Sequence, residues 1–123
     1  MAPSVSPVVK RALLIEPQTL FAPFFSATLT AAGYDRIEAV ERVEPSDAFP
    51  APFDTIVIDS GTVDEPLELV RAMRARFPVA KIVLYAHTID VMWEPLARSL
   101  GVDVLVGPRA DEAELRAAIA FAA

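Results

Sequence analysis

Two acidic side chains come directly after apolar stretches of the kind that form β-strands, and they are the strongest candidates for chemistry in this sequence. Glu16 follows the apolar run 12–15, and Asp59 follows the run 55–58. In an open parallel sheet, ligands bind beyond the carboxyl ends of the strands, where the strand order reverses. If the two runs are the first and third strands of such a sheet, both carboxylates project into one site.

The other residue types narrow what that site can do. His87 is the only histidine, and a general-base or metal-binding role for it would need partners, of which only Glu16 and Asp59 are expected nearby. Neither a catalytic triad nor a metal-ligand spacing is present. The chain has no cysteine and only four glycines, so thiolate chemistry and a glycine-rich phosphate loop are excluded. We therefore expect no enzyme activity.

The elements that must hold these residues alternate between short apolar runs and helical patterns. This alternation is typical of a parallel sheet covered by helices on both faces. The expected strands are 12–15, 37–40, 55–58, 81–85 and 102–106. The expected helices are 18–32, 66–77, a third from Thr88 or Asp90 to Leu100, and 111–122. Right-handed crossovers then give an α/β fold, a doubly wound five-stranded parallel sheet of the flavodoxin-like order 2-1-3-4-5.

Glycine and proline indicate where these elements end. Gly33 and Gly101 come right after two helical patterns and are expected to end those helices as C′ residues. The stretch 44–52 has three prolines in nine residues, which makes it too short and too proline-rich for a good helix. We expect at most one turn between the second and third strands.

The composition limits the class of protein. The chain has 123 residues, 54% of them apolar, which argues for a packed core and against disorder. We expect a flexible segment over 1–10 and one domain over 11–123. No apolar run reaches the roughly 20 residues that a membrane span needs, and the first residues lack the apolar core of a secretion signal. We therefore expect a cytoplasmic protein with no membrane partner.

The charge disfavours nucleic acid as a partner. The net charge is −6, whereas phosphate binding relies on clustered lysine and arginine. Arg71, Arg74 and Arg76 do form a basic stripe on the second expected helix. We interpret this stripe as a solvated outer face.

Five short phrases, in this order and spacing, resemble the CheY-like receiver domain of response regulators over the chain from Arg11 onward. They are 11–16 (RALLIE), 29–34 (LTAAGY), 53–59 (FDTIVID), 67–70 (LELV) and 100–108 (LGVDVLVGP). Each phrase alone is weak, and their combination is fairly specific.

The resemblance gives the two acidic residues a role. Asp59 stands where a receiver has the aspartate that accepts a phosphoryl group as a nucleophile. Receivers also need Mg²⁺, usually held by an acidic pair at the end of the first strand. Glu16 and Asp59 are therefore the metal-ligand candidates, but the second residue of the pair is Pro17. The resemblance leaves room for at most a weak Mg²⁺ site and implies no other cofactor.

Three further positions depart from the family pattern. Gly107 replaces the lysine that pairs with the phosphoryl oxygens, so no positive charge remains there to offset the transferred charge. Tyr85 replaces a serine or threonine, and Val104 replaces the aromatic switch residue. Together with Pro17, these losses predict a degenerate receiver (a pseudo-receiver). Asp59 is then either a carboxylate kept for hydrogen bonds to the following turn or an acceptor with slow residual phosphorylation.

The function that follows is signal transduction of the two-component (phosphorelay) type, through protein–protein interaction. The expected partner is a histidine kinase, another signalling protein or a second copy of the chain. One alternative is a working receiver phosphorylated on Asp59 with Mg²⁺. Another is a sensor of a small ligand such as a nucleotide, bound near Arg98, Arg109 and Arg116.

Two helices offer candidate interaction surfaces. The first expected helix has no Asp, Glu, Lys or Arg from 18 to 32, although a helix that covers a sheet normally has a polar outer face. In the third expected helix, Met92 and Trp93 are adjacent, so their two side chains cannot both point toward the sheet. The candidate surface residues are Leu20, Phe21, Phe24, Phe25, Met92 and Trp93.

Overall fold

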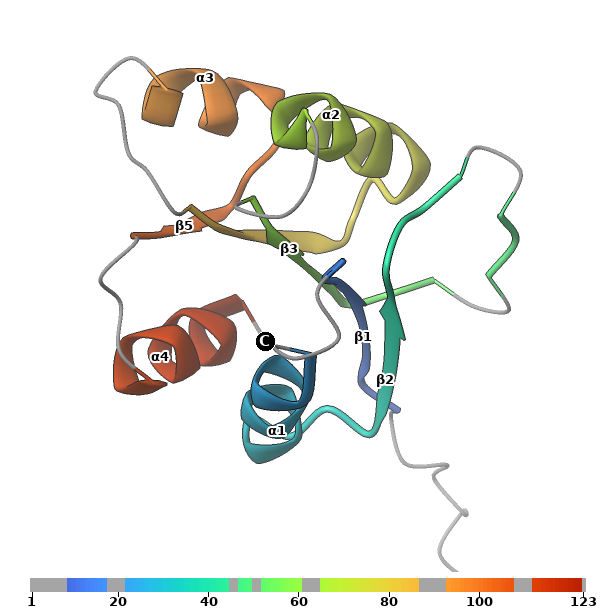
Figure 1. Cartoon of the computed structure of the whole chain (residues 1–123), viewed down its shortest axis with the longest axis vertical. Coiled ribbons are helices and arrows are strands. Elements are labelled where there is room, and N and C mark those ends of the chain that lie inside the picture. The colour runs from blue at the N-terminus through green and yellow to red at the C-terminus, as the bar shows by residue number, and fades with distance from the viewer. Residues whose placement is uncertain are drawn as a thin grey trace, which may run out of the picture.

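The protein forms a five-stranded parallel sheet with helices on both faces (Figure 1). The computed structural model describes residues 9–17, 22–44, 47–49, 52–60, 65–86, 93–107 and 112–122. The strand order is β2-β1-β3-β4-β5, and all four neighbouring pairs are parallel. The strands are β1 (Arg11–Ile15), β2 (Arg36–Val40), β3 (Thr55–Asp59), β4 (Lys81–Tyr85) and β5 (Val104–Val106). The expected fold class and strand order are confirmed.

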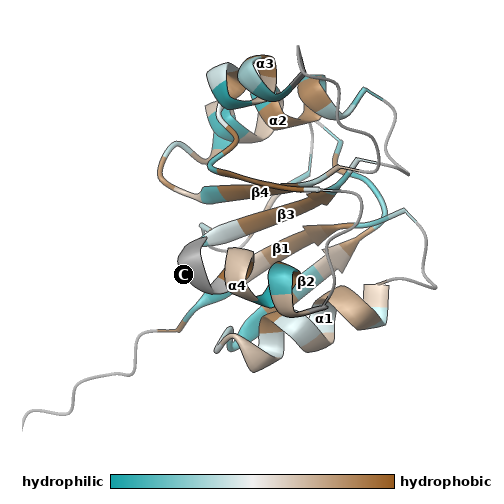
Figure 2. Cartoon of the chain, turned by 90° about the vertical axis from the view of Figure 1, so that its left-hand side faces the viewer, coloured by the Kyte–Doolittle hydropathy of each residue, from teal (hydrophilic) through white to brown (hydrophobic). Residues whose placement is uncertain are grey.

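Two helices cover each face of the sheet, as Figures 1 and 2 show. The helices in the described part of the chain are α1 (Ala22–Ala31), α2 (Pro66–Arg76), α3 (Trp93–Leu100) and α4 (Glu112–Ala122). Residues of α1 and α4 pack with one side of the strands in one buried cluster, and residues of α2 and α3 pack with the other side in a second cluster. Because both faces are covered, the middle residues of the central strands are apolar, and every residue of β3 is buried.

Two glycines end helices as expected. Gly33 has a φ of 98°, and the two bonds after α1 run from Gly33 N–H to the Thr30 carbonyl and from Tyr34 N–H to the Leu29 carbonyl. Gly101 has a φ of 119° and ends α3, where Val102 N–H donates to the Ala97 carbonyl. These are Schellman-type ends, in which a residue with positive φ lets the chain turn back on the helix.

The last strand is shorter than the sequence predicts. We expected a strand over 102–106, but β5 is Val104–Val106. Val102 completes the end of α3, and the Asp103 carboxylate accepts a hydrogen bond from Ile82 N–H at 2.9 Å. Val102 and Asp103 therefore belong to the connection that links α3 to the start of β4 and β5, and the prediction of strand at 102 and 103 was wrong.

The connection between β2 and β3 packs through aromatic rings. Its described residues, 41–44, 47–49 and 52–54, contain no helix, in line with the expected single turn at most. The rings of Phe49, Phe53 and Phe77 meet at centroid distances of 5.2–6.0 Å, and the Arg76 guanidinium lies 4.9 Å from the centroid of Phe49. These rings cover the edge of the sheet next to α2.

Some expectations fall on residues that the structure does not describe. The expected start of the first helix at 18, the caps at Thr88 or Asp90 and most of the expected flexible segment 1–10 lie outside the described residues. No helix in the described ranges is long and apolar enough to cross a membrane.

Candidate functional site

The carboxyl ends of the central strands place Glu16 and Asp59 side by side. Ile15 pairs with Ile58, so the next residues on the two strands, Glu16 and Asp59, are also opposite one another. Asp59 pairs in turn with Tyr85. The register thus places Glu16 and Asp59 at the same edge of the sheet, and a shared site for the two carboxylates stays a prediction.

The row formed by Glu16, Asp59 and Tyr85 faces the layer formed by α1 and α4. Side chains alternate along a strand, and the buried cluster against α1 and α4 contains Leu14, Val57 and Val83, two residues before Glu16, Asp59 and Tyr85. Glu16 is 2% exposed and Asp59 is 1% exposed. A reagent that attacks Asp59 must first reach a carboxylate that is covered by the protein.

Tyr85 is the neighbour of Asp59 on β4, and its ring is held by α1. Phe25 meets it edge-on, with the ring centroids 5.6 Å apart and the planes at 81°. The main chain at Tyr85 also holds the next turn, because Ser60 N–H donates to the Tyr85 carbonyl at 2.9 Å. Tyr85 thus places an aromatic ring at the strand position beside Asp59.

Of the other positions predicted to depart from the receiver pattern, Pro17 and Gly107 lie at the same edge, whereas Val104 is the first residue of β5 and pairs with Val83. Pro17 follows Glu16 directly and supplies no oxygen from its side chain. Gly107 follows the last residue of β5 and has no side chain. Val104, half-buried, packs among the core residues under α1 and α4.

The residues present do not fit a tightly bound Mg²⁺. The ion needs an octahedral shell of oxygens, and a site with one or two carboxylates depends on several waters to complete it. Glu16 and Asp59 are both nearly fully buried, which leaves little access for those waters. Within the described residues there is no group of three or more His, Cys, Asp or Glu side chains placed to hold a metal ion.

The candidate interaction surfaces are partly described. On α1, Phe24 is 44% exposed, whereas Phe25 is 3% exposed and belongs to the core. Phe25 is therefore not a surface residue, because its position on the helix turns it toward Tyr85. On α3, Leu96 is 49% exposed. Leu20, Phe21, Met92 and the side chain of Trp93 lie outside the described residues, as does His87.

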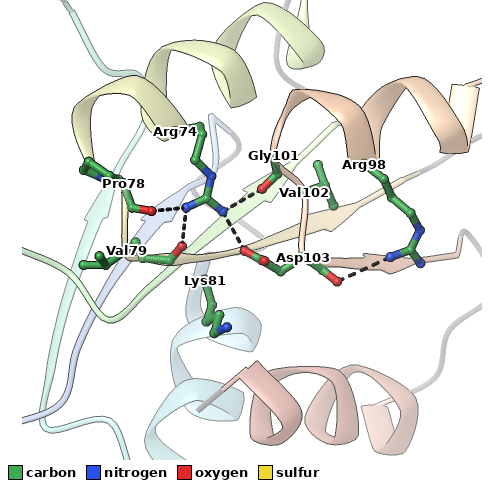
Figure 3. A pocket seen from close by; sticks show the side chains of 9 residues that line it. Arg74, Pro78, Val79, Lys81, Arg98, Gly101, Val102 and Asp103 are labelled. Carbon is green, nitrogen blue, oxygen red and sulfur yellow. Dashed lines mark hydrogen bonds and ion pairs between the residues drawn. The ribbon is translucent and has the colours of Figure 1, made fainter.

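A cavity of about 440 Å³ lies at the opposite edge of the sheet, at the start of β4 and β5, and Arg74 dominates it (Figure 3). Arg74 Nη1 donates to the Ala80 carbonyl at 2.7 Å, and Nη2 donates to the Gly101 carbonyl at 2.7 Å and to Asp103 Oδ2 at 2.6 Å. The interpretation of the arginine stripe as a solvated face was wrong for Arg74, because its side chain reaches inward to these carbonyls. Sequence periodicity predicts which residues of a helix begin on its outer face. It does not predict that a long side chain such as that of Arg74 bends back toward the protein.

The arginines of the proposed ligand site do not share one face. Arg98 is on α3 and lines the same cavity as Arg74, where it is paired with Glu94 at 3.4 Å. Arg116 is on α4, which covers the opposite face of the sheet (Figure 1). Arg109 lies outside the described residues.

Comparison with solved structures places this geometry in a known fold. Chemotaxis response regulator CheY4 of Vibrio cholerae superposes with a TM-score of 0.75 at 18% identity, and the match covers 94% of this chain and 100% of that one. The chain has the CheY-like receiver fold. Its Asp59 edge is the carboxyl edge of a receiver sheet.

Two other receiver-fold structures are similar over most of the chain. A response regulator of Burkholderia pseudomallei with a phosphorylated aspartic acid, a calcium ion and citrate gives a TM-score of 0.75 at 21% identity, covering 89% of this chain and 66% of that one. A protein of Burkholderia thailandensis described as a pilus assembly protein (cpaE) gives 0.77 at 18% identity, covering 93% and 98%. No family model and no curated protein matches the sequence.

Proposed function

We propose that this receiver-fold chain is a signalling module of the two-component type that acts by binding other proteins, without efficient phosphoryl transfer to Asp59. The observation that carries the proposal is the surroundings of that aspartate. Tyr85 occupies the adjacent strand position with its ring packed against Phe25, and Gly107 supplies no charge at the end of β5.

The chemistry explains why these changes matter. Phosphoryl transfer depends on positioning and on positive charge that stabilises the oxygens of the transferred group. Loss of one metal-ligand position at Pro17 and of the lysine position at Gly107 removes two sources of that stabilisation. A carboxylate that is 1% exposed is also poorly accessible to a phosphodonor.

The surface of α1 is the contact region we propose for a protein partner, either a histidine kinase or another signalling protein. The helix Ala22–Ala31 carries no charged residue, although the chain has a net charge of −6. Its exposed residues include Phe24, and phenylalanine is among the residues enriched in protein interfaces. An uncharged surface also lets an acidic partner, or a second copy, approach with little repulsion.

The alternative is a working acceptor. It is favoured by the register that puts Glu16 next to Asp59 and by the fold shared with the phosphorylated response regulator of Burkholderia pseudomallei. Under this alternative, Mg²⁺ and a phosphoryl group enter the site despite its burial.

An NMR titration with a phosphoryl mimic separates the two functions. We would add Mg²⁺ with beryllofluoride to the ¹⁵N-labelled chain and follow the amides of Ser60, which follows Asp59 on β3, and of Ala86, which follows Tyr85 on β4. The proposal predicts no shift of either amide in the wild type. The matched gain-of-function variant, Pro17→Asp with Tyr85→Thr and Gly107→Lys, is expected to respond. Wild-type shifts that disappear in Asp59→Ala would establish the acceptor alternative.

A further inference from the structure

Three aromatic rings form a continuous series from the surface of α1 to the strand next to Asp59. Phe24 meets Phe25 edge-on at 5.5 Å and 71°, and Phe25 meets Tyr85 edge-on at 5.6 Å and 81°. Edge-to-face pairs at these distances are favourable beyond the area they bury, and the gain depends on ring orientation. The orientation of each ring is therefore tied to that of the next.

The two ends of the series differ in a way that matters for signalling. Phe24 is 44% exposed and can touch a partner, whereas Phe25 is 3% exposed. At the inner end, the Tyr85 carbonyl accepts the Ser60 N–H bond at 2.9 Å, and Ala86 N–H donates to the Val106 carbonyl at 2.9 Å. These two hydrogen bonds join the end of β4 to the end of β3 on one side and to the end of β5 on the other.

We propose that Phe25 and Tyr85 couple the outer surface of α1 to the Asp59 end of the sheet. A partner that contacts Phe24 then changes how firmly the ends of β3 and β4 are held. This inference rests on the proposed function, since it says how binding at α1 is transmitted inside a module that does not use phosphorylation. Tyr85 takes part as a positioning residue through its ring.

The packing gives the coupling its physical basis. Protein interiors are close-packed, so a buried ring cannot move without its neighbours adjusting. Thr28 Oγ1 also donates to the Phe24 carbonyl at 3.0 Å, which links Phe24 to the next turn of α1. A change at Phe24 is thus passed to Phe25 with little freedom for the helix to absorb it.

Amide hydrogen exchange of the full chain tests the coupling. We would compare Phe24→Ala with Leu96→Ala, a matched control because Leu96 is a similarly exposed apolar residue, at 49%, on α3. Phe24→Ala is expected to raise the exchange rates of the Ser60 and Ala86 amides about two- to tenfold, the range of one aromatic pair. The reference is the Lys81 amide, bonded to the Asp54 carbonyl at the other end of β4, which should not change.

A second substitution tests whether the effect passes through the rings. In a Phe25→Leu background, Phe24→Ala should no longer alter Ser60 or Ala86. A Tyr85→Leu background should abolish the effect of Phe24→Ala in the same way. Tyr85→Phe keeps the ring and should preserve the effect. This pair of variants keeps the test decisive if the Phe25 variant fails to fold.

Equal effects of Phe24→Ala and Leu96→Ala on the exchange of Ser60 and Ala86 would overturn the coupling. An effect of Phe24→Ala that persists in the Phe25→Leu or Tyr85→Leu background would also overturn it. The experiment contains no phosphodonor. Its failure is therefore distinct from the discovery that Asp59 accepts a phosphoryl group.

Discussion

At the scale of single residues, two tyrosines lie at opposite ends of the sheet, one partly buried and one buried. Tyr85 lies beside Asp59 at the carboxyl ends of the strands. Tyr34 lies near their amino ends, buried, with its hydroxyl 2.5 Å from Thr55 Oγ1. Burial raises the pKa of Tyr34 above its ordinary value of 10.0; the Thr55 hydrogen bond partly opposes this, and the nearby Asp54 adds to the increase.

The raised pKa of Tyr34 predicts a loss of stability at high pH. Above about pH 10 the unfolded chain ionises this tyrosine while the folded protein keeps it protonated, so the free energy of unfolding falls as the pH rises, by at most about 1.4 kcal/mol per pH unit. Tyr34→Phe should be less stable near pH 7 by about 1–2 kcal/mol, because Thr55 loses a buried partner. The deficit should shrink above pH 10. Urea unfolding at pH 7–11 checks this, and parallel pH curves for the two proteins would contradict it.

At the scale of elements, three aspartates that directly precede strands accept hydrogen bonds from main-chain N–H groups near the starts of neighbouring strands. Asp35 accepts from Lys10 N–H, Asp54 accepts from Arg11 N–H, and Asp103 accepts from Ile82 N–H, at 2.8–3.0 Å. Arg74 adds a link between the turn after α2 and the turn after α3. A Cβ on Gly101 would lie 2.7 Å from Arg74 Nε, whereas a Cβ on Gly33 would meet nothing within 4 Å.

This difference predicts unequal costs for the same substitution. Gly33→Ala should cost about 1 kcal/mol, from positive φ alone. Gly101→Ala should cost roughly 2–3 kcal/mol, because Arg74 must also move and lose bonds to carbonyls. In an Arg74→Ala background most of the extra cost of Gly101→Ala should vanish. The exposed Arg71 on the same helix gives the control variant, Arg71→Ala, which should change stability by less than about 0.5 kcal/mol. Additive costs in denaturant unfolding would exclude the proposed link.

The sequence predicted the elements better than the contacts between them. Apolar runs ending in Glu16 and Asp59 were enough to place both carboxylates at one edge, because parallel strands share their carboxyl ends. The shortened β5 was missed, since Asp103 is used for a hydrogen bond to Ile82 N–H that no local pattern reveals. The contact of Phe25 with Tyr85 was also missed, because it joins residues far apart in the chain.

At the scale of the whole molecule, the chain has the receiver fold, and the changed surroundings of Asp59 are part of our proposal. The sheet order and register depend on buried apolar strands and on helix ends at glycine, and these do not require the lysine, the second acidic residue or the hydroxyl of a receiver. The fold therefore persists when those residues are replaced. Under our proposal function lies at the surface, and α1 is a helix without charged residues in a chain of net charge −6.

The intact mass of the chain after incubation with acetyl phosphate and Mg²⁺ tests the central claim most directly, with Asp59→Ala treated in parallel. We predict that the wild type and the variant both keep their unmodified masses, because Asp59 is buried and Gly107 supplies no positive charge at the end of β5. A gain of one phosphoryl group by the wild type alone would contradict the account and make Asp59 the switch of a working receiver.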